Sequence, residues 1–181
     1  MKQLVLVTLV SAVLFSGLAV PALSDPDSLE VKVTPLVLSV NIDEETLDYG
    51  ALALSSADDS RSSKASQELF VTNTGSVIAD LLIQGSNATS TAGGSSNWAL
   101  NCSPTDVGTV GANQYVHRFL TGASTDWAQG KALCPASSQP LASGVDALTG
   151  QVGFKLQMNM PTSSTGFGER ISTVIVTAVQ P

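Results

Sequence analysis

The residues from 45 to 85 constrain the fold more than any other part of the chain, because apolar and polar side chains alternate there between turn-forming residues. A spacing of two residues is the period of a half-buried β-strand, whose side chains point in turn to opposite faces of a sheet. Each run ends in residues that tolerate the positive φ of tight turns. The alternating apolar residues are Leu47 and Tyr49 before Gly50, Leu69 and Val71 before Asn73-Thr74-Gly75, and Leu81 and Ile83 before Gly85. The stretch therefore predicts an antiparallel β-sheet.

The same stretch resembles a known kind of domain. The order LDYG, a Ser-rich segment and ELFVTNTGSVIADLLI is similar to the immunoglobulin-like domains of secreted bacterial proteins, in particular the ASH-type and choice-of-anchor domains. It resembles the TasA/camelysin-like filament proteins more loosely. The resemblance implies a β-sandwich fold and does not imply an activity.

The N-terminus has the three parts of a secretory signal peptide. Lys2 supplies a positive charge, the run from Leu4 to Val20 is almost continuously apolar, and Ala22-Leu23-Ser24 supplies small residues at alternate positions. A retained membrane anchor is the alternative, but the apolar run is short for a hydrocarbon core of roughly 30 Å and no basic stop follows it. We therefore expect a signal peptide over 1–24, cleavage near Ser24, and a single domain over 25–181. The mature form is then secreted, extracellular or periplasmic, without a membrane span.

The charge of the chain excludes one class of function. All 15 acidic residues follow Ser24, whereas Lys2 is one of only 8 basic residues. Nucleic-acid binding requires clustered Lys and Arg that displace counterions, and this chain has no basic stripe. We therefore expect no nucleic-acid partner. A weakly charged chain rich in Ser, Thr, Gly and Ala is typical of an extracellular β-protein.

Three further segments have strand patterns. The apolar residues of Leu36–Ile42 alternate after Pro35, and a proline favours an edge strand because it cannot donate to a ladder. This strand either pairs within its own domain, which we favour, or completes the sheet of a neighbouring subunit. Gln151–Met160 alternates cleanly, and Arg170–Val179 is apolar on both faces, which predicts a strand covered from two sides. The fold class is therefore all-β, an antiparallel immunoglobulin-like β-sandwich of roughly seven to ten strands, with a jelly-roll-like sandwich as the alternative.

Cys102 and Cys134 are the only cysteines in a chain that carries a secretion signal. An oxidising compartment and an even count of cysteines favour a disulfide between them. Two thiolates do not complete a structural zinc site, and the single histidine does not complete it either. We predict a Cys102–Cys134 disulfide and no metal or cofactor.

His117 is the one candidate for a general base, and its surroundings favour a packed residue. Tyr115, His117 and Phe119 share one face of a predicted strand, with Val116 and Arg118 on the other. The chain has no GxSxG nucleophile motif, and a disulfide explains both cysteines. We therefore predict no catalytic residue and no enzymatic activity.

The remaining candidate sites have ordinary alternatives. The acidic residues of Asp43-Glu44-Glu45, with Asp48, suit either calcium or a solvated turn, and we favour the turn because the spacing does not match an EF-hand loop. Asn87 and Asn101 each begin an N-glycosylation tripeptide, a pattern that arises often by chance in Ser/Thr-rich chains.

The sequence thus favours a secreted, non-enzymatic structural or interaction module of the cell envelope or extracellular matrix. Its expected partner is an envelope or extracellular protein, a polysaccharide, or a second copy of itself. One alternative is a filament subunit that polymerises through its N-terminal strand. Another is a carbohydrate- or calcium-binding module that uses Trp98 and Trp127 or the acidic turn.

Overall fold

The computed structural model describes residues 32, 35–54, 63–93, 95–102 and 110–181. Contacts divide the chain into two units, Met1–Thr34 and Pro35–Pro181, and the fold described below is that of the second unit. The predicted signal peptide and its cleavage point lie outside the described residues. Within those residues, no helix is long and apolar enough to cross a membrane.

The second unit is all-β. Its described residues form twelve strands and a single 3₁₀ turn at Trp127–Gln129. The strands are β1 (Val40–Ile42), β2 (Ser63–Ala65), β3 (Leu69–Asn73), β4 (Ala79–Gly85), β5 (Thr89–Ser90), β6 (Ala99–Leu100), β7 (Gln114–Thr121), β8 (Lys131–Ala132), β9 (Gln139–Val145), β10 (Gln151–Asn159), β11 (Arg170–Ile171) and β12 (Val174–Val179).

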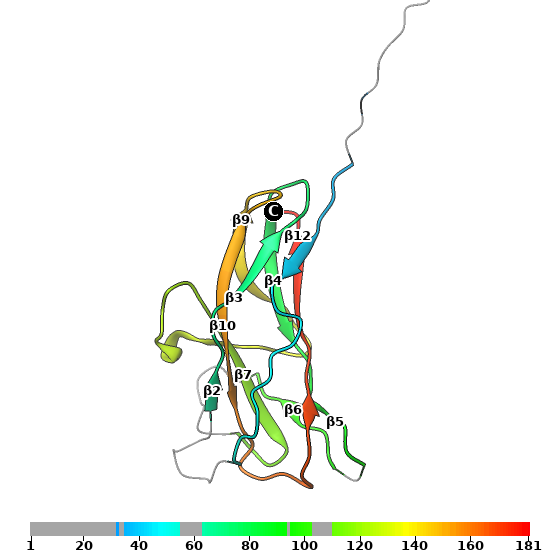
Figure 1. The fold of residues 1–181 in the computed structure, drawn as a ribbon, viewed down its shortest axis with the longest axis vertical. Coiled ribbons are helices and arrows are strands. Elements are labelled where there is room, and N and C mark those ends of the chain that lie inside the picture. The colour runs from blue at the N-terminus through cyan, green and yellow to red at the C-terminus, as the bar shows by residue number, and fades with distance from the viewer. Residues whose placement is uncertain (1–31, 33–34, 55–62, 94, 103–109) are drawn as a thin grey trace, which may run out of the picture. The chain divides into compact units, whose positions relative to one another are not determined.

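The strands form two main sheets (Figure 1). The larger has the order β1-β3-β10-β7-β6, with β2 added to β10 and β8 added to β7. The smaller has the order β12-β4-β9, and β5 pairs with β11 separately. Pairing is antiparallel throughout the described strands except between β6 and β7, which run parallel. The all-β sandwich predicted from the sequence is confirmed.

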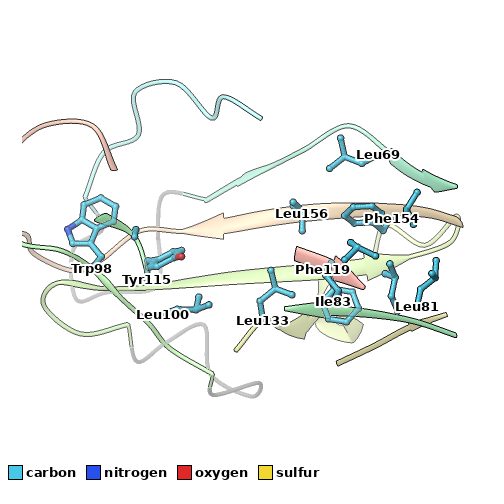
Figure 2. Close-up of a cluster of buried hydrophobic side chains, with 14 of the residues drawn as sticks. Leu69, Leu81, Ile83, Trp98, Leu100, Tyr115, Phe119, Leu133, Phe154 and Leu156 are labelled. Atoms are coloured by element: carbon cyan, nitrogen blue, oxygen red, sulfur yellow. The ribbon is translucent and has the colours of Figure 1, made fainter. Parts of the chain in front are cut away.

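One apolar core joins the inner faces of the two main sheets (Figure 2). In β3 and β4 every second side chain is buried and the intervening ones are half-buried, which is the pattern expected of strands with one face on a core. The residues of β3, β4 and β10 that we predicted to face inward belong to this core: Leu69, Val71, Leu81, Ile83, Phe154 and Leu156. The register read from the alternation of these strands is therefore correct.

The N-terminal strand is shorter than predicted. Only Val40 and Ile42 pack against the core, and both are half-buried. Leu36 and Leu38, which we predicted to face inward, are 66% and 44% exposed. They lie in the leader, defined here as Pro35–Ser39, whose backbone bonds to the turn after β3 instead of lying over the core. The alternation of the leader is therefore not a burial pattern. As predicted, β1 is an edge strand, and it pairs with β3 of its own chain.

Two other strand predictions are wrong in part. The segment 170–179 divides into β11 and β12, and β12 is covered on one face only, because Val176 is buried while Ile175 is 49% exposed. Residues 43–54 have no regular strand, although Tyr49 packs half-buried against the core and Leu47 is 37% exposed. The strand β11 pairs with β5 whereas β12 pairs with β4, and alternation alone does not report such a change of partner.

The two turn glycines of the opening pattern are required for different reasons. Gly50 has a φ of 65°, as the sequence predicts for a turn glycine. Gly75 is not among the glycines with positive φ. A Cβ at Gly75 would collide with the carbonyl oxygen of Val37, so the missing side chain lets the leader approach the turn.

The register of the core makes a direct prediction about stability. Leu81→Ala should lower the free energy of unfolding by about 2–5 kcal/mol, because it removes a fully buried side chain from the contact between the sheets. Thr72→Ala, on the opposite face of β3, should cost about 0.5 kcal/mol. Urea unfolding of the two variants measures both. Equal losses would contradict the observed register.

Candidate functional site

The strand β7 is the centre of the most enclosed part of the molecule. Six consecutive residues of this strand are buried, so both of its faces are covered. Tyr115 and Phe119 face the main core, whereas Val116 packs with Val110 and Ala132 in a second apolar cluster on the other side. The sequence predicted the division into two faces but not the burial of the second one, because Val110 and Ala132 come from segments whose sequence has no alternating pattern.

His117 is enclosed in this strand and bonds to a distant tyrosine. Its Nε2 and the hydroxyl of Tyr49 are 3.0 Å apart, and the two rings meet edge to face with centroids separated by 5.8 Å. The ring of Tyr115 lies 6.3 Å away on the same face. The Nδ1 of His117 has no hydrogen-bond partner among the described residues. No carboxylate or nucleophilic hydroxyl of serine bonds to this imidazole in the part of the chain that is described.

Burial sets the protonation of this pair. It lowers the pKa of His117 to about 4 and raises that of Tyr49 above its ordinary value, with the nearby Tyr115 adding to the second effect. The imidazole is therefore neutral at pH 7, and the phenol keeps its proton. These properties suit a packed, hydrogen-bonded histidine, as the sequence indicated, because a general base requires a pKa close to the working pH.

The buried histidine predicts a loss of stability in mild acid. The unfolded chain binds a proton at the ordinary pKa of 6.5, and the folded chain binds it only near 4. Stability is therefore fully present above the unfolded value and falls as the pH decreases toward the folded value. Between pH 7 and pH 5 this one group should lower the free energy of unfolding by about 2 kcal/mol.

The matched control is His117→Gln, which keeps a polar group for Tyr49 but does not titrate. Because His117 is the only histidine in the chain, the variant removes the whole imidazole contribution. Urea unfolding from pH 7 to pH 5 should show a smaller slope for the variant. A wild-type slope equal to that of the variant would contradict the prediction.

The two cysteines meet at one edge of β7. The strand β6 pairs parallel with Gln114 and Tyr115 of β7, and β8 pairs antiparallel with Arg118 and Phe119. The two short strands therefore run toward each other along β7. Their continuations bond to neighbouring carbonyls of β7, from Asn101 N to Tyr115 O and from Leu133 N to His117 O, both 2.8 Å. Cys102 and Cys134 follow these residues and so are brought together from opposite ends of a long loop.

Both cysteines are free thiols here, and their sulfur atoms are not at disulfide distance. The two thiols are nevertheless neighbours. Desolvation, followed by interactions with the neighbouring Cys134 thiol, raises the pKa of Cys102 to about 11. Cys102 is exposed and Cys134 is buried, so only one of the two thiols is open to a reactant. The predicted disulfide therefore stays a prediction, and the fold places the two cysteines beside the same edge of β7.

The two tryptophans do not form a shared platform for a sugar. Trp98 is only 7% exposed, its Nε1 donates to Ser164 Oγ at 2.9 Å, and the guanidinium of Arg170 lies 5.0 Å from its ring. Trp127 is half-buried at the start of the 3₁₀ turn. The ring of Trp98 is therefore occupied by the protein itself.

The acidic residues before β3 act mainly on the backbone. Asp43 Oδ1 accepts a hydrogen bond from Phe70 N at 2.9 Å, and Asp48 Oδ1 accepts one from Gly50 N at 2.7 Å. Among the described residues, no three side chains of His, Cys, Asp or Glu are grouped so that they could hold a metal ion. The contact of Asp48 is that of a turn, whereas Asp43 bonds to the backbone of β3.

The two glycosylation tripeptides differ in their settings. Asn87 is exposed, and its Oδ1 accepts a hydrogen bond from Leu100 N at 2.9 Å. Asn101 is half-buried beside the thiol pair.

A surface feature that the sequence did not predict lies where the leader joins the sandwich. Ser76 N donates to Val37 O at 2.9 Å, and Leu148 N donates to Gly75 O at 3.0 Å, so the leader, the β3–β4 turn and the β9–β10 turn are adjacent. Five large apolar residues of these segments are exposed and together are called the leader patch: Leu36, Val37, Leu38, Ile78 and Leu148. Leu36 and Leu38 are part of the alternation in Leu36–Ile42 that we interpreted as core, and Val37 lies between them.

Comparison with known proteins gives no assignment, because no family model, no curated protein and no solved structure matches this chain.

Proposed function

We propose that this protein is a secreted, non-enzymatic structural or interaction module of the cell envelope or extracellular matrix. The observation that carries the proposal is the leader patch. Exposed apolar residues scattered singly are ordinary, but a group of them at one end of a sandwich marks a contact surface. Leu36 and Leu148 are each 66% exposed, so a partner that covers them removes apolar surface from water.

The chemistry of the patch favours a protein partner over a small ligand. Its residues come from two turns and the leader, where Val37 exchanges hydrogen bonds with Ser76 and Leu148 N donates to Gly75 O. Side chains held on ordered segments lose less entropy when a partner covers them. The partner we propose is an envelope or extracellular protein with an apolar surface of its own.

The test is binding of the mature protein to the cell-envelope fraction of the producing organism. The double variant Leu36→Ser/Leu148→Ser should reduce sedimentation with this fraction by about tenfold or more, since two apolar contacts worth about 1 kcal/mol each are removed. The control is Leu47→Ser, which replaces an exposed leucine outside the patch. Equal binding by wild type, double variant and control would remove the support for the proposal.

A filament subunit is the second candidate, and the exposed leader is what favours it. Residues 35–39 contact their own chain mainly through a few backbone bonds to the β3–β4 turn. Such a segment exchanges between subunits at little cost to the core. Electron microscopy of the same preparations separates the two candidates, because fibres that disappear in the double variant would favour the filament.

We further propose that Cys102 and Cys134 form a disulfide after secretion. The contact between their side chains supports this proposal, and a small movement of the chain ends after β6 and β8 would bring the sulfur atoms together. The raised pKa of Cys102 means that few thiolates are present at pH 7, so oxidation by air alone should be slow. A catalyst of disulfide formation in the compartment would then set the rate.

The disulfide proposal predicts the thiol content of the secreted protein. Protein isolated from its own compartment should have no thiol that reacts with Ellman's reagent under denaturing, non-reducing conditions. Reduction should then lower its free energy of unfolding by about 3–4 kcal/mol, the chain-entropy value for a loop of this length. The double variant Cys102→Ser/Cys134→Ser controls for the reductant, which should leave its stability unchanged. Two reactive thiols in the native protein would refute the bond.

A further inference from the structure

The edges of the two main sheets are not equally protected against the addition of another strand. An edge strand presents unpaired N–H and C=O groups, and folded proteins block such edges with short strands, prolines, irregularities or charges. On the larger sheet, β1 is three residues long and the opposite edge is shared by the two-residue strands β6 and β8. On the smaller sheet, β9 contains Pro140, and its register against β4 is irregular.

The remaining edge, β12, has none of these features, and β1, which lies near it, does not pair with it. It is six residues long with the sequence VIVTAV, and it pairs in regular register with β4 from Val174 to Val179. It contains no proline, glycine or charge, and among the described residues β4 is its only ladder partner. Figure 1 shows it beside β4 in the smaller sheet. Half of its backbone hydrogen-bonding groups therefore point away from the sheet.

We propose that β12 pairs antiparallel with the β12 of a second copy of this chain, which joins the two smaller sheets into one continuous sheet. Identical strands that pair antiparallel are related by a two-fold axis, so one self-complementary contact closes the assembly as a dimer. This surface is different from the leader patch, and the inference does not rest on the proposed function.

The charge distribution favours a second copy as the occupant. The chain has a formal net charge of −7, so contact between two copies is opposed by repulsion unless the contact surface is neutral. The last eleven residues, Ile171–Pro181, contain no charged side chain. Two β12 edges can therefore approach without placing like charges opposite each other.

The faces of the strand restrict the register. The inner faces of both copies must lie on the same side of the joined sheet. Residues directly opposite each other share a face, so a residue of one copy must pair with a residue of the other that lies on the same face of the strand. This holds only when the two-fold axis lies at a residue position, so that this residue pairs with its own equivalent. An axis at Val176 pairs Ile175 with Thr177 of the second copy, and an axis at Thr177 pairs Ile175 with Val179 of the second copy. In both registers the exposed Ile175 gains a cross-strand neighbour.

The test is sedimentation velocity of the full-length mature protein from about 10⁻⁶ to 10⁻³ M. The wild type should change from monomer to dimer over this range, because a contact of one strand is small and therefore weak. The variant Ile175→Lys/Thr177→Lys should stay monomeric, since an axis at 175, 176 or 177 then places lysine opposite lysine. Both positions are exposed in the monomer, so its fold should be unchanged by circular dichroism.

The matched control is Ser143→Lys/Thr149→Lys, which adds the same charge at two exposed positions on β9 and the turn after it. It should dimerise as the wild type does. Hydrogen exchange gives a second measurement, in which protection of the β12 amides should rise with protein concentration. A wild type that stays monomeric, a control that loses dimerisation equally, open-ended polymers, or β12 protection that does not depend on concentration would each overturn the proposal.

Discussion

The structure depends on the apolar contact between its two main sheets. In this contact the inner faces of β3, β10 and β7 pack against the inner face of β4. The side chains of Val71, Phe154, Phe119 and Ile83 belong to a single apolar core, and each of the strands that carry them lies between two other strands of its sheet. Because the free energy of this contact is proportional to buried apolar area, it holds the two layers together. The short strands β1, β6 and β8 lie at the edges of the larger layer.

The enclosed parts of the molecule follow from this arrangement. Segment 131–135 leaves β7 and crosses to β4, where Gly85 N donates to Cys134 O at 3.3 Å. Gly85 has no room for a side chain, since a Cβ there would lie 2.7 Å from Leu100 and 2.9 Å from Leu133. His117 lies on β7 and Cys102 lies beside it, and desolvation lowers the pKa of the first and raises that of the second.

The candidate contact surfaces lie where the layered core ends. The leader patch is formed by turns and by the segment that precedes β1, and β12 is the last strand of its sheet. These surfaces contribute little to the core and can accept a partner without disturbing it. That separation between a fixed sandwich and its margins is what we expect of an interaction module.

The sequence by itself determined the all-β class and the register of the strands with one face on the core. Leu69, Leu81 and Phe154 were placed correctly because side-chain period is a local property of a strand. Contacts between distant segments were decided only by the tertiary structure. Three features depend on which segments lie alongside a strand: the exposure of Leu36 and Leu38, the second covered face of β7 and the unpaired edge of β12. Alternation in the sequence does not report them, because it is the same whether or not a neighbour covers the strand.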